Sequence, residues 1–306
     1  MNAELEQVVA QVGKVVKGKD KVIRKVLAAM LAGGHILLED IPGVGKTTLA
    51  MAFGKAMKLE YRRMQFTPDV LPSDIVGFTM YNGAKGTFEY KEGAVFANLF
   101  LADELNRTSA KTQSALLEVM EEAKVTVDGV SHKLPEPFTV IATENPFGAS
   151  GTQLLPESQL DRFLICLSMG YPDHASAVDV LKGSSEKGLE QVESVICAEG
   201  LMEFRRLANG LHVEKAMYEY IVNLTEATRK DKRIALGISP RGSIALLKMA
   251  KAMAVLRGGD YVIPEDVLEV VEDVWKHRIH LNAKARSEGT DTSKVIMELT
   301  ERIHAV

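Results

Sequence analysis

The stretch that decides the fold runs over residues 35–50 and reads His35-Ile36-Leu37-Leu38-Glu39-Asp40-Ile41-Pro42-Gly43-Val44-Gly45-Lys46-Thr47-Thr48-Leu49-Ala50. Its first four residues form a short apolar run, which is typical of a buried strand in a parallel sheet. Its last residues begin a helical pattern. The glycine-bearing turn between them lets consecutive backbone N–H groups point at phosphate oxygens, and the helix adds the positive end of its dipole. The stretch therefore predicts a phosphate-binding loop.

Residue types within this loop suggest individual roles. We expect Lys46 to reach the β and γ phosphates and the Thr47 hydroxyl to ligate Mg²⁺. The strict pattern of such loops has glycine where Asp40 stands, so here a residue with a side chain must make the entry turn. The expected nucleotide-binding residues of the loop are Pro42, Gly43, Val44, Gly45, Lys46, Thr47 and Thr48.

Two adjacent carboxylates, Asp103 and Glu104, end a later apolar run that begins at Asn98. Taken alone, such a pair usually marks a strand that enters solvent. Beside a phosphate-binding loop, Asp103 can hold the metal ion together with Thr47, and Glu104 can orient and deprotonate an attacking water molecule. We therefore expect Asp103 and Thr47 at a metal site and Glu104 among the catalytic residues, with Lys46.

Three further polar residues are catalytic candidates. Asn145 ends the next predicted strand and could hold the water or the γ phosphate, although it could also cap a turn. Arg162 precedes the last strand and could act as an arginine finger, or it could form a structural ion pair with Asp161 or Glu157. Arg241 follows Ser239 and Pro240 at the start of a helix, where it could reach phosphate or be a surface residue.

Short apolar runs alternate with helical stretches over the first half of the chain, which predicts an α/β fold with a parallel sheet covered on both faces. Two segments interrupt the alternation, near 78–90 and 124–134, and their turn residues predict hairpins. After residue 170 the strand-like runs disappear. We therefore expect an αβα domain over residues 1–170 and a smaller, all-helical domain over residues 171–306.

Composition excludes several classes of protein. The 306 residues carry a net charge of −4, which argues against nucleic acid as the main partner because phosphate neutralisation needs clustered Lys and Arg. No apolar stretch is long enough to span a membrane. The N-terminus lacks the pattern of a secretion signal, and two cysteines cannot form a disulfide framework. These features favour the cytoplasm.

The chain resembles the MoxR-type AAA+ ATPases from end to end, through motifs at residues 40–47, 65–74, 103–107, 142–146, 155–163 and 239–241. The resemblance implies an αβα P-loop domain followed by a helical lid, with ATP and Mg²⁺ as cofactors. It implies that Asp103 and Glu104 form the Walker B motif and that Asn145 is sensor 1. It makes Arg162 the finger that acts on a neighbouring subunit and Arg241 sensor 2, in its own subunit or across the interface.

By the same resemblance, the two hairpins are family inserts, and Val16 and Gly18 border the adenine pocket. Glu144 stands where relatives often carry Gln. The family forms homo-oligomeric rings, commonly hexamers, and often works with proteins that carry von Willebrand A domains. The chain is thus expected to couple Mg²⁺-dependent ATP hydrolysis to the remodelling of protein partners. Two alternatives are a DNA-engaged motor or loader and a scaffold that senses nucleotide without hydrolysing it.

Overall fold

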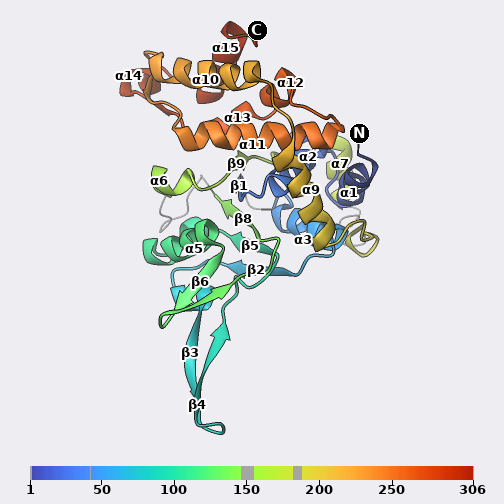
Figure 1. Ribbon diagram of the computed structural model, residues 1–306, viewed down its shortest axis with the longest axis vertical. Coiled ribbons are helices and arrows are strands. Elements are labelled where there is room, and N and C mark those ends of the chain that lie inside the picture. The colour runs from blue at the N-terminus through green and yellow to red at the C-terminus, as the bar shows by residue number, and fades with distance from the viewer. Residues whose placement is uncertain (1, 42, 146–154, 182–187, 306) are drawn as a thin grey trace.

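A five-stranded parallel sheet forms the centre of the first half of the chain (Figure 1). The computed structural model describes residues 2–41, 43–145, 155–181 and 188–305. The sheet has the spatial order β2 (Tyr61–Gln65), β5 (Leu99–Asp103), β8 (Thr139–Glu144), β1 (Ile36–Glu39) and β9 (Ile165–Leu167), with every neighbouring pair parallel. The predicted α/β fold with a parallel sheet is confirmed.

Alternate residues of the strands supply two separate hydrophobic cores. Ile36 and Leu38 of β1 belong to the core under α1 (Ala3–Gly13), α2 (Asp20–Leu31) and α3 (Lys46–Ala56). Leu37, between them, belongs to the core on the opposite face, which contains residues of α5 (Ala110–Glu122). Strands buried on both faces carry continuous apolar runs, which explains why these segments were recognisable in the sequence.

Both predicted hairpins are present. The first pairs β3 (Gly77–Asn82) with β4 (Thr87–Glu92) and projects away from the body of the molecule (Figure 1). The second pairs β6 (Lys124–Val127) with β7 (Val130–Lys133), and its two turn residues, Asp128 and Gly129, have φ of 49° and 78°, as a tight hairpin turn requires. The Tyr90 ring stacks on the ring of His132, which links the two hairpins.

Short helical elements follow several of the strands. They are α4 (Pro72–Val76), the 3₁₀ helix η1 (Leu105–Arg107), α6 (Glu157–Leu160) and α7 (His174–Leu181). The C-terminal part is built from α9 (Ala198–Gly210), α10 (Lys215–Lys230), α11 (Pro240–Arg257), α12 (Pro264–Leu268), α13 (Val271–Trp275), α14 (Ala283–Ser287) and α15 (Thr292–Arg302).

The expectation of an entirely helical C-terminal part needs one correction. A small antiparallel pair, β10 (Ile234–Leu236) and β11 (His280–Leu281), accompanies the helices there. Strands of three and two residues are too short to produce a recognisable period of two, so the sequence pattern did not reveal them.

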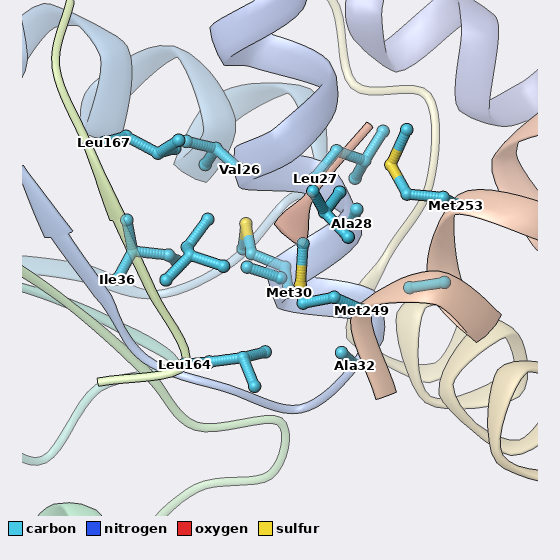
Figure 2. Close-up of a cluster of buried hydrophobic side chains, with 14 of the residues drawn as sticks. Val26, Leu27, Ala28, Met30, Ala32, Ile36, Leu164, Leu167, Met249 and Met253 are labelled. Carbon is cyan, nitrogen blue, oxygen red and sulfur yellow. The ribbon is translucent and has the colours of Figure 1, made fainter. Parts of the chain in front are cut away.

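Helix α2 packs between the sheet and the long lid helix α11 (Figure 2). Figure 2 shows side chains of α2 between Ile36 and Leu164 on one side and Met249 and Met253 of α11 on the other. An ion pair of 2.5 Å between Lys25 and Asp273 adds a polar connection.

Among the described residues, no helix combines the length and the apolar character needed to cross a bilayer.

Candidate active site

The predicted phosphate-binding loop leaves the carboxyl end of β1 and enters α3, as the sequence indicated. Gly43 and Gly45 have φ of 86° and 93°, in the left-handed region that favours glycine, and α3 begins directly afterwards at Lys46. Open space surrounds the position that a side chain at Gly43 would occupy. Pro42, which also belongs to the expected nucleotide-binding residues, lies outside the described residues. The described part of the loop thus turns through two left-handed glycines directly into the start of a helix.

A pocket of about 350 Å³ lies next to this loop. The loop and the start of α3 contribute one side of it, and the ends of β5 and β8 contribute another. Eight of the sequence-predicted residues with polar or loop roles therefore meet in one place, together with two residues of β2. The lining residues are Gly43, Gly45, Lys46, Thr47, Thr48, Asp103, Glu104, Asn145, Arg63 and Gln65.

Lys46 is buried and its ammonium group folds back onto its own loop. Its Nζ donates hydrogen bonds to the backbone oxygens of Asp40, at 2.7 Å, and Ile41, at 3.3 Å. Burial lowers the pKa of the Lys46 ammonium, and the nearby carboxylates of Asp40, Asp103 and Glu104 oppose that effect. A lysine held this way is a positive charge beside open space, which suits an anionic ligand.

Asp103 is held by hydrogen bonds on both carboxylate oxygens. Thr143 of β8 donates to Oδ1 at 2.7 Å, and Arg63 of β2 donates to Oδ2 at 2.7 Å from Nη2 and at 3.2 Å from Nε. The same Thr143 hydroxyl accepts a 2.8 Å hydrogen bond from the backbone N–H of Glu104. Together with Thr47, these carboxylates form a set of hard oxygen donors, the kind of ligand that Mg²⁺ prefers.

Glu104 occupies an unusual backbone conformation, with φ of 56° and ψ of 50°. A non-glycine residue pays about 1 kcal/mol or more to stay in this region, and such strain concentrates at functional sites. The Glu104 side chain makes a 2.6 Å ion pair with Arg107. This backbone conformation turns the chain from the end of β5 directly into η1, next to the pocket.

Arg162 and Arg241 do not line this pocket. They line a second cavity, of about 190 Å³, together with Gly33, Gly34 and His35, the residues that precede β1. The phosphate-binding loop follows the carboxyl end of β1, whereas this second cavity lies at its amino end. The two cavities are therefore at opposite ends of the strands. The ion pairs considered for Arg162 do not form: Asp161 pairs with Arg278 at 2.7 Å, Glu157 with His280 at 3.1 Å, and Arg162 with Glu121 at 3.3 Å.

Comparison with known proteins identifies the family. Residues 35–165 match the sequence model of the ATPase family associated with various cellular activities (AAA), and residues 226–299 match the AAA lid domain. The chain is 36% identical to Chaperone MoxR1 of Mycobacterium tuberculosis, over 98% of this chain and 81% of that relative. The chain belongs to the MoxR family of AAA+ ATPases. Its αβα domain followed by a lid is the expected architecture of this family.

Two further comparisons agree with this assignment to the MoxR family. The Uncharacterized protein YeaC of Bacillus subtilis is 44% identical, over 98% of this chain and 94% of that relative. The crystal structure of a protein from Cytophaga hutchinsonii superimposes with a TM-score of 0.92 at 40% identity, and the match covers 99% of this chain and 95% of that one. The similarity therefore extends over the AAA+ domain and the lid together.

In this MoxR-family chain, Asp40 has a role that the strict loop pattern does not contain. Its Oδ2 accepts hydrogen bonds from the backbone N–H of Gly170, at 2.6 Å, and from the hydroxyl of Ser168, at 2.9 Å, and its Oδ1 accepts one from the N–H of Ile41, at 2.9 Å. Burial works to raise the pKa of the Asp40 carboxyl, but these hydrogen bonds outweigh it and hold the pKa below its ordinary value. The Asp40 side chain thus connects the phosphate-binding loop to the segment after β9 through hydrogen bonds.

Val16 and Gly18, which the MoxR resemblance assigned to an adenine pocket, do not line the cavity at Lys46. Val16 is buried, and Gly18 has φ of 68°. A Cβ atom at Gly18 would approach the Ser176 hydroxyl to 2.7 Å, so this position is closely packed against the start of α7. Their role in base binding stays a prediction.

Arg63 and Gln65 are the pocket residues that sequence reasoning did not assign. Both belong to β2, which lies beside β5 in the sheet with Gln65 opposite Asp103. Their spacing of two places them on one face of the strand. That alternation was visible in the sequence, but the pairing of β2 with β5 was not.

Proposed function

We propose that this MoxR-family protein hydrolyses ATP with Mg²⁺ and uses the cycle to remodel protein partners. One observation carries the proposal: Lys46, Thr47, Asp103 and Glu104 line the same pocket, at the start of a helix that follows a loop with two left-handed glycines. These are the charges and ligands that phosphoryl transfer from a nucleoside triphosphate to water requires.

The residues of the loop fit the phosphates, and Thr47 together with Asp103 of β5 fits the metal. Backbone N–H groups of residues 43–48 and the Lys46 ammonium would hold the β and γ phosphates. The Thr47 hydroxyl and the Asp103 carboxylate would hold Mg²⁺, because both are hard oxygen ligands beside the loop. Bound Mg²⁺ supplies neutralisation of the charge that develops on the phosphate oxygens.

Glu104 and Asn145 would handle the attacking water molecule. Glu104 accepts the proton, and the Asn145 side chain orients the water or the γ phosphate. The strained backbone of Glu104 supports this assignment, because residues with strained backbones cluster at functional sites, where the strain positions a side chain. In this conformation Oε2 of Glu104 is paired with Arg107 at 2.6 Å.

Arg162 and Arg241 would complete the active site of a neighbouring subunit. Both arginines lie at the end of the sheet opposite to the phosphate-binding loop of their own chain. This position supports action across a subunit interface for Arg241 as well as for Arg162. An arginine supplied in this way contributes about 10³ to 10⁵ to the rate in related NTPases. A homo-oligomeric ring, of six subunits as is common in the family, would place such residues at every interface.

The wider functional assignments rest on the family. We propose a nucleotide-binding domain over residues 1–170, a lid over residues 171–306, and protein clients that include partners with von Willebrand A domains. The name of Chaperone MoxR1 supports a chaperone-like role. Both cysteines are free thiols, which supports a location in the reducing cytoplasm.

A titration with a fluorescent ATP analogue and an assay of phosphate release test the core of this proposal. We expect the wild-type protein to bind the analogue and release phosphate in a Mg²⁺-dependent way, and Lys46→Ala to lose both properties. Lys111→Ala, an exposed lysine of α5, is the matched control and should change neither. Binding that is indifferent to Lys46→Ala would refute the proposed site. Strong stimulation of hydrolysis by duplex DNA would instead favour the DNA-engaged motor.

A further inference from the structure

Arg63 is paired with Asp103, the carboxylate that is expected to help bind the metal. Its Nη2 and Nε atoms both donate to Oδ2 of Asp103, at 2.7 Å and 3.2 Å, and Nη2 also donates to Oε1 of Gln65 at 3.0 Å. Arg63 belongs to the edge strand β2 and Asp103 to its neighbour β5. No motif in the sequence pointed to this arginine.

Both carboxylate oxygens of Asp103 accept hydrogen bonds. Thr143 donates to Oδ1 and Arg63 to Oδ2. The Asp103 side chain is 12% exposed, whereas that of Arg63 is 45% exposed. The nearly buried Asp103 carboxylate is therefore paired with a long side chain that is half-exposed. The Arg63 side chain can move without disturbing the hydrophobic core.

The charges around the pocket show why that cation matters. Lys46 is the cation of the loop, and its Nζ is directed at backbone carbonyls. Glu104 has its own partner in Arg107, so Arg63 is the guanidinium that balances Asp103. A triphosphate entering this pocket without a metal would meet the Asp103 carboxylate, and like charges at close range in a partly buried site repel strongly.

We propose that Arg63 is the resting counter-ion of Asp103, which neutralises this carboxylate whenever no metal is bound and so permits the triphosphate to enter. This inference rests on the proposed function, because it assumes that the pocket binds ATP and Mg²⁺. Arg63 is a positioning residue in this scheme, since it acts through Asp103. With Mg²⁺ held at Asp103, the carboxylate would be neutralised by the ion, and Arg63 would be dispensable for nucleotide binding.

A different account would make the pair a structural clamp between β2 and β5. The backbone ladder from Tyr61 to Gln65 already joins these two strands, whether or not the two side chains pair. A third account would make Arg63 a direct ligand of the phosphates. The three accounts differ in how nucleotide affinity responds to Mg²⁺, which makes them separable.

The experiment titrates the full-length protein with a fluorescent ATP analogue, once in excess Mg²⁺ and once in EDTA. We expect Arg63→Gln to weaken binding about tenfold in EDTA and by less than about twofold in Mg²⁺. Arg62→Gln is the matched control, because Arg62 is the neighbouring residue of β2 and pairs with Glu60 instead. It should leave both affinities unchanged.

A double variant tests whether the effect passes through Asp103. Removing the carboxylate charge in Arg63→Gln/Asp103→Asn should restore the affinity in EDTA to within about threefold of the wild type. Arg63→Lys keeps a positive charge and should retain most of the EDTA affinity, so it serves if Arg63→Gln folds poorly by circular dichroism.

Equal losses in Mg²⁺ and in EDTA would make Arg63 a direct phosphate ligand and overturn the inference. Unchanged affinities in both conditions, or no restoration in the double variant, would also overturn it while leaving the proposed function intact. Failure of the wild-type protein to bind the analogue in either condition would overturn the proposed function, and this inference with it.

Discussion

Arg162 and Arg241 bind the same carboxylate. Nη2 of Arg241 lies 2.5 Å from Oε1 of Glu121, and Nη2 of Arg162 lies 3.3 Å from Oε2 of Glu121. Arg162 comes from the segment before β9, Arg241 from the start of α11 and Glu121 from the end of α5. These two ion pairs therefore connect the lid with the AAA+ domain, at the end of the sheet opposite to the phosphate-binding loop.

This arrangement predicts that two inactive variants will complement each other. Arg162→Ala keeps its own loop but gives its neighbour no finger, and Lys46→Ala keeps Arg162 but has a defective loop. In a mixed ring, a loop from the first variant can meet an arginine from the second. Phosphate release from a 1:1 mixture should reach about a quarter of the wild-type rate, the share of interfaces with both residues intact in random assembly.

The same mixing experiment decides where Arg241 acts. We expect Arg241→Ala to be complemented by Lys46→Ala as Arg162→Ala is, because both arginines occupy the same cavity. Each variant alone must still form the wild-type oligomer by sedimentation. If a mixture shows only the summed activity of its two parents, the arginine concerned acts within its own subunit or has no role in hydrolysis.

Glu104→Gln should separate nucleotide binding from hydrolysis. The substitution keeps the shape of the side chain and removes the base, so turnover should fall about a hundredfold or more while affinity for ATP is retained. The measurement is single-turnover phosphate release beside a binding titration. Glu118→Gln, on the exposed face of α5, should behave like the wild type. Normal turnover by Glu104→Gln would exclude Glu104 as the general base.

Asp40 should contribute to stability although glycine is the usual residue at its position. Asp40→Ala removes a buried carboxylate that accepts hydrogen bonds from Gly170, Ser168 and Ile41. Hydrogen bonds to charged groups contribute about 1.5–3 kcal/mol, so the free energy of unfolding should fall by about 3 kcal/mol in urea titrations. Asp40→Gly, which restores the strict loop pattern, should lose at least as much because glycine adds flexibility.

Removing an exposed carboxylate provides the control for Asp40. Asp69→Ala, at an exposed position after β2, should change the free energy of unfolding by less than about 0.5 kcal/mol. A loss below about 1 kcal/mol for Asp40→Ala would show that the hydrogen bonds to Gly170 and Ser168 are replaced by water at little cost.

The local parts of the site were predictable from sequence, and the long-range parts were not. The loop at Lys46 and the pair Asp103–Glu104 each carry their chemistry within a few consecutive residues, beside strands that are recognisable as apolar runs. Arg63 becomes a site residue only because β2 lies next to β5, and strand order is not encoded in any short segment.

Glu121 illustrates the same limit for the second cavity. In the sequence it is one of several acidic residues near the end of an amphipathic helix, where exposure is the ordinary expectation. Its significance depends on the position of α11, which brings Arg241 to it from 120 residues away. Predicting such a contact requires the packing of the lid against the AAA+ domain, which sequence periodicity does not supply.

Glu144 should make the stability of this protein fall as the pH rises. It is 4% exposed and lies opposite Glu39 in the sheet. Burial, and secondly the charge of Glu39, raise the pKa of Glu144 from 4.5 to about 7. The folded chain therefore keeps the proton up to about pH 7, whereas the unfolded chain releases it near pH 4.5, so stability is lost between these values as the pH increases.

Glu144→Gln should abolish this loss, because glutamine occupies the same space without a charge. The shift in pKa corresponds to about 3 kcal/mol, so the variant should be more stable than the wild type by up to that amount at pH 8 and similar to it at pH 4.5. Burial lowers the pKa of His35 to about 4 and gives the opposite trend, with stability lost below pH 6.5, but it does so equally in both proteins. Urea unfolding of the two proteins at both pH values measures the difference directly. An equal difference at pH 4.5 and pH 8 would mean that the folded and the unfolded chain release the Glu144 proton over the same pH range, and that burial does not raise the pKa of Glu144.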